Sequence, residues 1–233
     1  MEQLDYYQIQ IVLALMFREE ARFSELNITG LSSSHFNYHI EQLVAEKYIQ
    51  KNAHSRYELT ARGKKLATHI DIFSGELEVM PLTCVSALAM REVDGVRQYL
   101  VHQRNKHPHF GYYSLPGGKA KHGHLLINEV LRELKEETGL TGLPELIQIN
   151  RGLSVNQGQA EVLVDAVYYI YKVTDVRGTL RDTKEGKNSW FTREEINQLQ
   201  PVFADLLAAI AHVESAKAST LTFTEVFEEY PTI

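Results

Sequence analysis

The spacing of apolar residues changes at Pro81, and this change constrains the fold more than any other feature of the sequence. Before Pro81, apolar residues recur every three or four positions, which indicates amphipathic helices. After it they form strand-length runs separated by turn signals such as Asp94-Gly95. A chain of 233 residues is long enough for two domains. We therefore expect a two-domain α+β protein, with domains at residues 1–80 and 81–233.

The first domain has the order helix, helix, helix, hairpin, helix. One helix is expected from Tyr6 to Phe17, and Ser24 and the serines at 32–34 are expected to cap the next two. Tyr48–Lys51 and Arg56–Leu59 alternate like the strands of a hairpin before a fourth helix. This order is typical of a winged helix-turn-helix domain.

The second domain is expected to consist mainly of strands, at residues 82–90, 96–103 and 161–172. One strong helix, Leu125–Thr138, interrupts them and ends at Gly139, a left-handed stop signal. Another helix is expected from Pro201 to about Val213, where the core of the domain ends. In the tail that follows, 214–233, the segment Leu221–Phe227 could add an edge strand or hold a dimer together. We expect a homodimer.

Cysteine content and charge narrow the class of protein. Cys84 is the only cysteine, so no intrachain disulfide forms, and its apolar surroundings favour a small buried hydrophobe over a nucleophile. The net charge of -6 argues against coating nucleic acid or membrane by bulk electrostatics. The first residues lack the pattern of a signal peptide, and the apolar run Ile11–Phe17 is too short to span a bilayer, so we expect a cytoplasmic protein.

The helix expected at Leu125–Thr138 carries an acidic face. Glu133, Glu136 and Glu137 are spaced so that their carboxylates project from one side and repel one another. A hard divalent cation such as Mg²⁺ would turn that repulsion into attraction. The glycines of Pro116-Gly117-Gly118, just upstream, can bring bare backbone close to a metal and a phosphate. The alternative is a solvated charged helix face.

Taken with these glycines, the segment resembles the Nudix box: Gly, five residues, Glu, seven residues, then Arg-Glu-aliphatic-any-Glu-Glu-any-Gly-aliphatic. Eight of the nine positions match: Gly118, Arg132, Glu133, Leu134, Glu136, Glu137, Gly139 and Leu140. His124 stands where the family has Glu. The resemblance covers most of residues 81–213 and implies a Nudix α/β/α sandwich with a mixed sheet.

The resemblance implies a hydrolase that cleaves the phosphoanhydride of a nucleoside diphosphate linked to another moiety, as in ADP-ribose. It implies that Mg²⁺ or Mn²⁺ is bound by Glu133, Glu136, Glu137 and the Gly118 carbonyl, and that Arg132 orients a carboxylate. Glu185 becomes a candidate base or auxiliary ligand, with a charged turn as the alternative. Glu129 could join the acidic face as a substitute for the missing Glu. Substrate contacts are expected from Arg104, Tyr113, Gly117 and Lys119.

The first domain, around His35–Val44 and Tyr57–Gly63, resembles bacterial winged-helix regulators. The resemblance implies that DNA is contacted by Ser33, Ser34, His35, Asn37, Tyr38, Lys51 and Arg56. Basic residues concentrate at 47–65, with six Lys or Arg and one acid. The alternative is a winged helix used only for dimerisation.

The whole chain is similar to the Nudix-related regulators of bacterial NAD metabolism, in which the domain order is reversed. It could therefore be a transcription regulator whose second domain binds a nucleotide metabolite without useful turnover. His124 favours this hypothesis, whereas the intact stretch from Arg132 to Leu140 favours catalysis.

Overall fold

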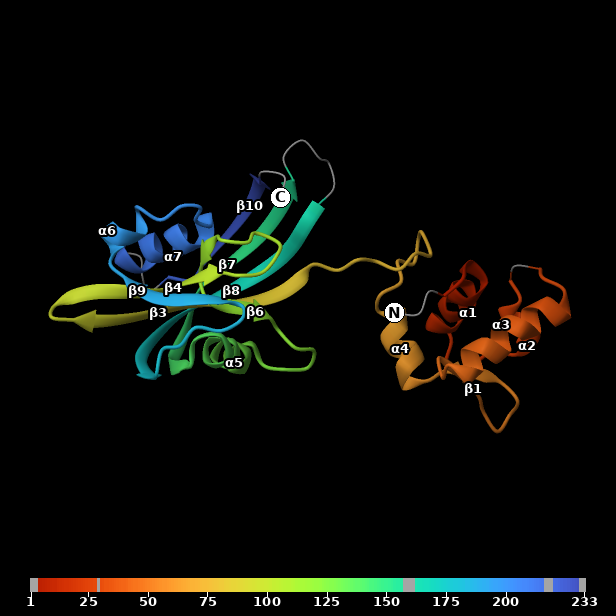
Figure 1. Cartoon of the computed structure of the whole chain (residues 1–233). Coiled ribbons are helices and arrows are strands. Elements are labelled where there is room, and N and C mark those ends of the chain that lie inside the picture. Colours follow the sequence, from red (N-terminus) through yellow and green to blue (C-terminus); the bar gives the residue numbers. More distant parts are fainter. Residues whose placement is uncertain (1–3, 29, 157–161, 216–219, 231–233) are drawn as a thin grey trace. The chain divides into compact units, whose positions relative to one another are not determined.

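The structure, a computed structural model, describes residues 4–28, 30–156, 162–215 and 220–230, the last five by their backbone alone. The chain divides into two compact units, Met1–Met80 and Pro81–Ile233 (Figure 1). Each unit has its own hydrophobic core. None of the helices in these described ranges has the length and apolar character to cross a bilayer.

The first unit contains three helices, a two-stranded hairpin and a fourth helix, in the predicted order. The elements are α1 (Tyr6–Met16), α2 (Phe23–Leu26), α3 (Ser33–Ala45), β1 (Ile49–Lys51), β2 (Tyr57–Leu59) and α4 (Ala61–Ala67). The predicted cap Ser32 is confirmed, since its side chain accepts from the His35 N–H. The prediction for Ser24 is wrong: it lies inside α2, whose N-cap position is Arg22 because the Glu25 carboxylate accepts from the Arg22 N–H at 2.7 Å.

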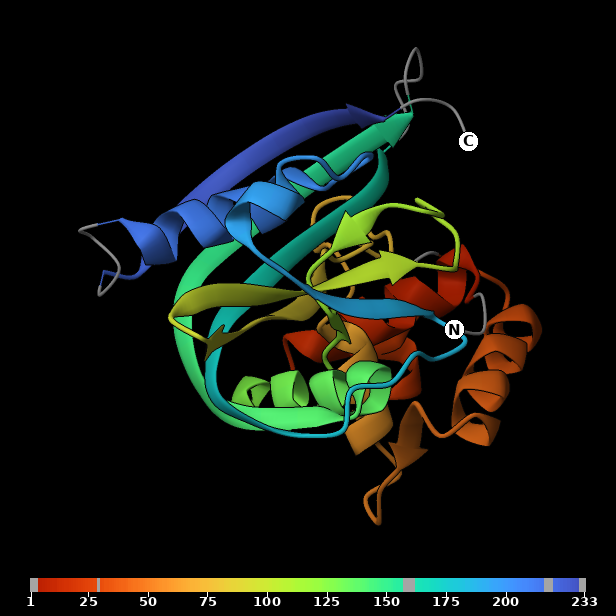
Figure 2. The ribbon, with the colours of Figure 1, turned by 60° about the vertical axis from the view of Figure 1, so that its left-hand side comes forward.

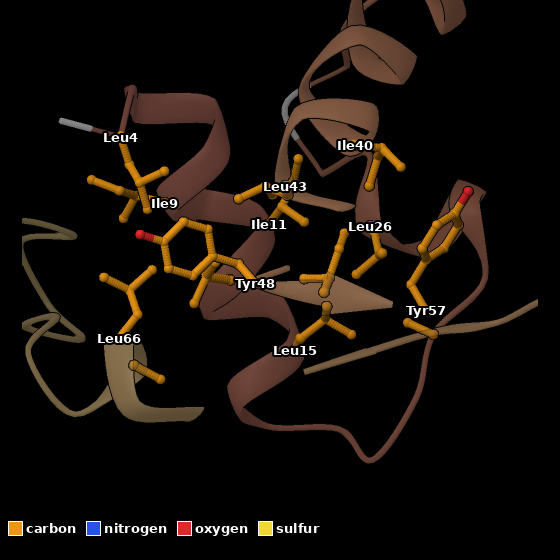
Figure 3. Packing of buried hydrophobic residues seen from close by; sticks show 14 of the residues in the cluster. Leu4, Ile9, Ile11, Leu15, Leu26, Ile40, Leu43, Tyr48, Tyr57 and Leu66 are labelled. Carbon is orange, nitrogen blue, oxygen red and sulfur yellow. The ribbon is translucent and has the colours of Figure 1, made fainter. Parts of the chain in front are cut away.

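Apolar side chains from every helix of this unit meet in one core. Ile11 and Leu15 of α1 pack with Leu26 of α2 and with Ile40 and Leu43 of α3, all almost completely buried (Figure 3). The three- and four-residue spacing along α1 and α3 places these side chains on one face of each helix. The core therefore fixes how the short α2 sits against its longer neighbours.

The second unit is built on a mixed sheet of eight strands. They are β3 (Leu82–Val93), β4 (Val96–Arg104), β5 (Tyr113–Ser114), β6 (Gly117–Lys119), β7 (Leu140–Asn156), β8 (Val162–Gly178), β9 (Gly186–Phe191) and β10 (Thr222–Tyr230). The main path is β10-β7-β8-β3-β4-β5, with β6 beside β3 and β9 beside β4. β3 is parallel to β8 and β10 is parallel to β7, while the remaining pairs are antiparallel.

Helices cover both faces of this sheet. α5 (Leu126–Thr138) lies on one side, and α6 (Arg193–Ile196) and α7 (Ala204–Glu214) lie on the other (Figures 1 and 2). The side chains of β3 alternate between the two layers: Val85 packs in the cluster under α5, whereas Leu88 packs in the cluster under α7. The second unit is thus a three-layered α/β/α arrangement.

The structure differs from the predicted strands in several places. β5, β6, β7 and β9 were not predicted as strands. β10 belongs to the sheet, so residues 222–230 are not a tail outside the core, and the edge-strand alternative for this segment is confirmed. The strand predicted at 161–172 is confirmed from Val162 and extends to Gly178, while residue 161 lies outside the described residues.

Candidate functional site

The position at which helix α5 ends is fixed by its C-terminal glycine. Gly139 has φ 81°, and a Cβ there would lie 2.4 Å from the Thr179 carbonyl oxygen, so only glycine ends the helix at this point. Val130 and Leu134 are fully buried against the sheet. These two side chains fix the rotation of the helix about its axis. The glutamates that are spaced about one turn apart along the helix therefore project from the side away from Val130 and Leu134.

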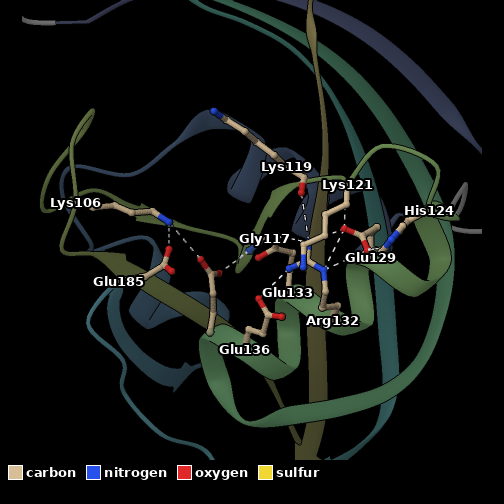
Figure 4. Close-up of polar contacts among 11 residues, drawn as sticks. Lys106, Gly117, Lys119, Lys121, His124, Glu129, Arg132, Glu133, Glu136 and Glu185 are labelled. Carbon is tan, nitrogen blue, oxygen red and sulfur yellow. Dashed lines mark hydrogen bonds and ion pairs between the residues drawn. The ribbon is translucent and has the colours of Figure 1, made fainter. Parts of the chain in front are cut away.

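Arg132 lies at the centre of the acidic helix. Its guanidinium donates to Glu129, to Glu133 at 2.6 Å and to Glu136 at 2.8 Å (Figure 4). It also donates to the backbone carbonyl of Lys119 at 3.3 Å. The carboxylate-orienting role of Arg132 stays a prediction, which these contacts support, and the last contact ties the end of β6 to the helix. One cation thus offsets the repulsion among three carboxylates.

His124, which departs from the Nudix pattern, is paired with Glu129. Its Nδ1 lies 2.7 Å from Glu129 Oε1, and the Lys121 N–H donates to the other carboxylate oxygen at 3.0 Å. Arg132 foremost, with the Lys121 N–H and His124, lowers the pKa of the Glu129 carboxyl to about 2. Only 1% of Glu129 is exposed. It is therefore sealed beneath Arg132, rather than on the open acidic face that the sequence suggested.

The segment Pro116-Gly117-Gly118, here called the glycine loop although its two glycines begin β6, lies directly against α5. The Gly117 N–H donates to Glu137 Oε2 at 2.8 Å. A Cβ at Gly118 would lie 2.7 Å from the Glu133 carboxylate. A side chain at position 118 would force the flexible end of the Glu133 side chain to move, so the glycine leaves room for this carboxylate beside the backbone.

Glu137 is buried, with 4% of its side chain exposed. Burial raises the pKa of its carboxyl to about 7, and Glu133 and Glu185 also raise it, while the Gly117 N–H and Lys106 act in the opposite direction. A carboxylate that is shielded from solvent in this way is strongly stabilised in its charged form by a nearby cation.

Lys106 joins Glu185 to this cluster, although the sequence did not single it out. Its ammonium pairs with the Glu185 carboxylate and lies 3.8 Å from Glu137 Oε1 (Figure 4). The pairing with Lys106 lowers the pKa of Glu185. The loop before β9 therefore places Glu185 beside the acidic helix, and Lys106 could have been suspected only from its position two residues after the basic strand end at Arg104.

A cavity of about 1260 Å³ is lined by Lys106 and Glu185, whereas Glu137 is not among its lining residues. Of the predicted site residues it is lined by Arg104, Gly117, Gly118, Lys119, Arg132, Glu133, Glu136 and Glu185. Arg104 brings a buried Nε that has no hydrogen-bond partner within the described part of the chain. Tyr113, predicted to contact substrate, is not among the lining residues because it packs in the core under α7.

Glu133, Glu136 and Glu137 together with the Gly118 carbonyl are the candidate ligands of a metal ion. Within the described residues, no three acidic, histidine or cysteine side chains already converge as a metal cluster. Glu133 and Glu136 are engaged by Arg132 instead. The donor set, all oxygen, nevertheless fits Mg²⁺ or Mn²⁺, and the absent Cβ at Gly118 leaves the backbone open beside Glu133. A cation would take over the neutralising role of Arg132.

Cys84 also lines the cavity, but as a buried thiol. Burial raises its pKa to about 11, with Glu133 adding to the effect and Lys119 opposing it. A thiol with this pKa is almost entirely protonated near neutral pH, so the structure favours the buried-hydrophobe interpretation of the sequence.

In the first unit, the residues predicted to contact DNA lie on α3 and on the β1–β2 hairpin. Ser33, Ser34, His35 and Tyr38 are exposed near the start of α3, and Lys51 is exposed on β1. Asn37 donates to Glu41, and Arg56 pairs with Glu20 at 3.2 Å. Arg56 is thus less available for a phosphate than Lys51.

Comparison with known proteins agrees with this division of the chain. The NUDIX domain family matches residues 80–212, and a domain of unknown function, DUF7347, matches residues 5–70. The NUDIX domain of Shewanella oneidensis NrtR, solved with ADP ribose, is similar at 21% identity and a TM-score of 0.52, covering 67% of this chain and 97% of that one. A MutT protein from Bacillus halodurans is similar at 26% identity and a TM-score of 0.49, covering 64% and 90%.

The network around Glu129 predicts unequal effects of two substitutions. Glu129→Ala removes the most buried of the carboxylates that accept from the Arg132 guanidinium, together with the acceptor of the Lys121 N–H, so we expect it to lower the free energy of unfolding by about 3 kcal/mol. His124→Ala removes one contact of a half-exposed ring and should cost less than about 1 kcal/mol. Urea unfolding followed by the fluorescence of Trp190, the single tryptophan, measures both. Equal losses in the two variants would contradict the geometry.

The raised pKa of Glu137 predicts a pH dependence in metal-free protein. A carboxyl whose pKa is about 7 when folded, above its value when unfolded, stabilises the fold at low pH and loses that contribution as pH rises through 7. Relative to Glu137→Gln, the wild type should therefore lose up to roughly 3 kcal/mol between pH 5 and pH 8. Urea unfolding curves followed by Trp190 fluorescence and recorded in EDTA measure this difference. If the free energies of unfolding of the two proteins change with pH in parallel, the prediction is contradicted.

Proposed function

The chain belongs to the Nudix family, and on that premise we propose that its second unit is a Mg²⁺-dependent hydrolase of a nucleoside diphosphate linked to another moiety. One observation carries the proposal: Glu133, Glu136, the Gly117–Gly118 backbone and Lys106 meet at one end of a single cavity. Carboxylates for a cation, bare backbone and a lysine form the set of groups that a diphosphate requires. ADP ribose, bound by the similar Shewanella domain, is the first compound to test.

In this mechanism Glu133, Glu136, Glu137 and the Gly118 carbonyl would hold Mg²⁺ or Mn²⁺. When bound, such an ion supplies positive charge against the diphosphate and makes water a better nucleophile. Lys106, Lys119 and the unpartnered Nε of Arg104 bind and orient phosphate oxygens. Glu185, kept ionised by Lys106, accepts a proton from the attacking water. Arg132 positions Glu133 and Glu136.

Product release from a substrate panel tests the hydrolase. The panel contains ADP-ribose, NAD, diadenosine polyphosphates and nucleoside triphosphates, each with Mg²⁺ or Mn²⁺. We expect turnover of at least one compound. In Glu136→Gln the turnover rate should fall about 100-fold or more, because the variant lacks one carboxylate ligand of the cation that stabilises the transition state. Glu194→Gln, an exposed glutamate on α6 outside the cavity, is the matched control. If the wild type turns over no compound of the panel faster than Glu136→Gln does, the proposal is contradicted.

A second function is favoured by the surface of α3. Its first turns present the exposed side chains of Ser33, Ser34, His35 and Tyr38, with no acidic residue among positions 33–38. We propose that the first unit is a winged helix-turn-helix domain that binds DNA through this surface, with Lys51 of the hairpin at a phosphate. The protein would then be a dimeric regulator that responds to the nucleotide bound by its second unit, with or without turnover.

DNA selection with the full chain tests this second function. A homodimer should recover a two-fold site whose half-sites lie about one helical turn apart. Lys51→Ala should weaken binding for all sequences and reduce the slope of log affinity against log salt by about 1, since one phosphate contact is lost. Lys187→Ala, an exposed lysine of the second unit, is the control. Binding with no sequence preference, or a salt slope unchanged by Lys51→Ala, would count against it.

A further inference from the structure

The end of the cavity away from the acidic helix has a different chemistry. Three polar side chains of β7, namely Gln148, Asn150 and Ser154, line it at alternating positions of the strand, with Gly152 between the last two. The strand alternation places them on one face, where Ile170, Tyr168 and Val164 are their neighbours on β8. Ile170 and Tyr168 pack in the cluster under α7, so the row lies on the α7 side of the sheet.

This row of β7 is buried but incompletely hydrogen-bonded. Gln148 is 4% exposed and Ser154 is 7% exposed, yet Gln148 Oε1 and Ser154 Oγ have no hydrogen-bond partner among the residues that the structure describes. A buried polar atom without a partner costs about 1–3 kcal/mol, so its presence in a cavity wall calls for a partner from outside the chain. Asn150, between them, is held by the Thr224 hydroxyl of β10, which donates to its Oδ1 at 2.6 Å.

The charges at this end exclude another phosphate as that partner. Gln148, Asn150 and Ser154 are neutral. Arg151 lines the cavity as well, but its guanidinium donates to both carboxylate oxygens of Asp165, at 3.3 and 3.1 Å. Asp205 of α7, an acidic residue, also lines the cavity. The basic residues Arg104, Lys106 and Lys119 are grouped with the glycine loop instead.

We propose that the row Gln148–Asn150–Ser154 binds the uncharged part of the substrate, a nucleobase or sugar that donates and accepts hydrogen bonds at adjacent atoms. This inference rests on the proposed function, since the diphosphate must lie at the acidic helix for its substituent to reach β7. An amide presents a donor and an acceptor side by side, which matches the edge of a base or neighbouring hydroxyls. β10 takes part by holding Asn150 in place.

Calorimetric binding to the full chain in Mg²⁺ tests the proposal with non-hydrolysable probes. The methylene analogue of ADP-ribose carries both a diphosphate and uncharged groups, whereas methylenediphosphonate carries only the charge. We expect the wild type to bind the first at least about tenfold more tightly. Gln148→Leu should remove about tenfold of the affinity for the ADP-ribose analogue and leave methylenediphosphonate within about twofold. Gln198→Leu, the same change at an exposed position of the second unit, should alter neither.

Further variants and probes make the result specific. Ser154→Ala and the isosteric Gln148→Glu should weaken the ADP-ribose analogue in the same direction, with thermal unfolding confirming that each variant is folded. A loss of affinity in Gln148→Leu for AMP but not for ribose 5-phosphate identifies the bound group as the base, whereas a loss for both identifies the sugar. Equal affinity of the wild type for the two methylene probes, or no loss in Gln148→Leu, overturns the subsite. Failure of methylenediphosphonate to bind the wild type instead contradicts the proposed function at the acidic helix.

Discussion

The contact of Arg132 with the carboxylates of α5 is the interaction on which the site depends. Glu129, Glu133 and Glu136 lie within two turns of one helix, and without a cation their charges would oppose its formation. The same guanidinium reaches the Lys119 carbonyl, so the glycine loop is held where Gly117 and Gly118 meet Glu137 and Glu133. The same side chain therefore both neutralises the carboxylates of α5 and holds the glycine loop against the helix.

That arrangement explains how the chain accommodates His124. Glu129 supplies Arg132 with a carboxylate from inside the helix. His124, which stands where the box has an acid, contacts the same carboxylate from the loop before α5. Positions 124, 129 and 132 are thus joined in a single hydrogen-bonded network.

The elements predicted well from the sequence are those whose local pattern agrees with their final environment. α5 has a regular apolar stripe and a glycine stop, and it was predicted to within one residue. β7 was missed because Gly142, Pro144 and Gly152 interrupt it, and irregularities in its pairing with β8 break the two-residue alternation. β9 is short and polar, and it becomes a strand only because β4 lies beside it. Such pairing between distant segments leaves no periodic signal in either one.

The sequence by itself determined the two-part organisation, the acidic helix and the glycine loop, because each depends on residues close together in the chain. Only the tertiary structure decided that Glu129 is buried beneath Arg132 and that Lys106 lies between Glu137 and Glu185. It also placed Tyr113 in the core and brought β7, β10 and α7 around the far end of the cavity. These outcomes depend on burial and on contacts between distant segments, which set the electrostatic environment of a side chain and are not encoded in the spacing of its neighbours.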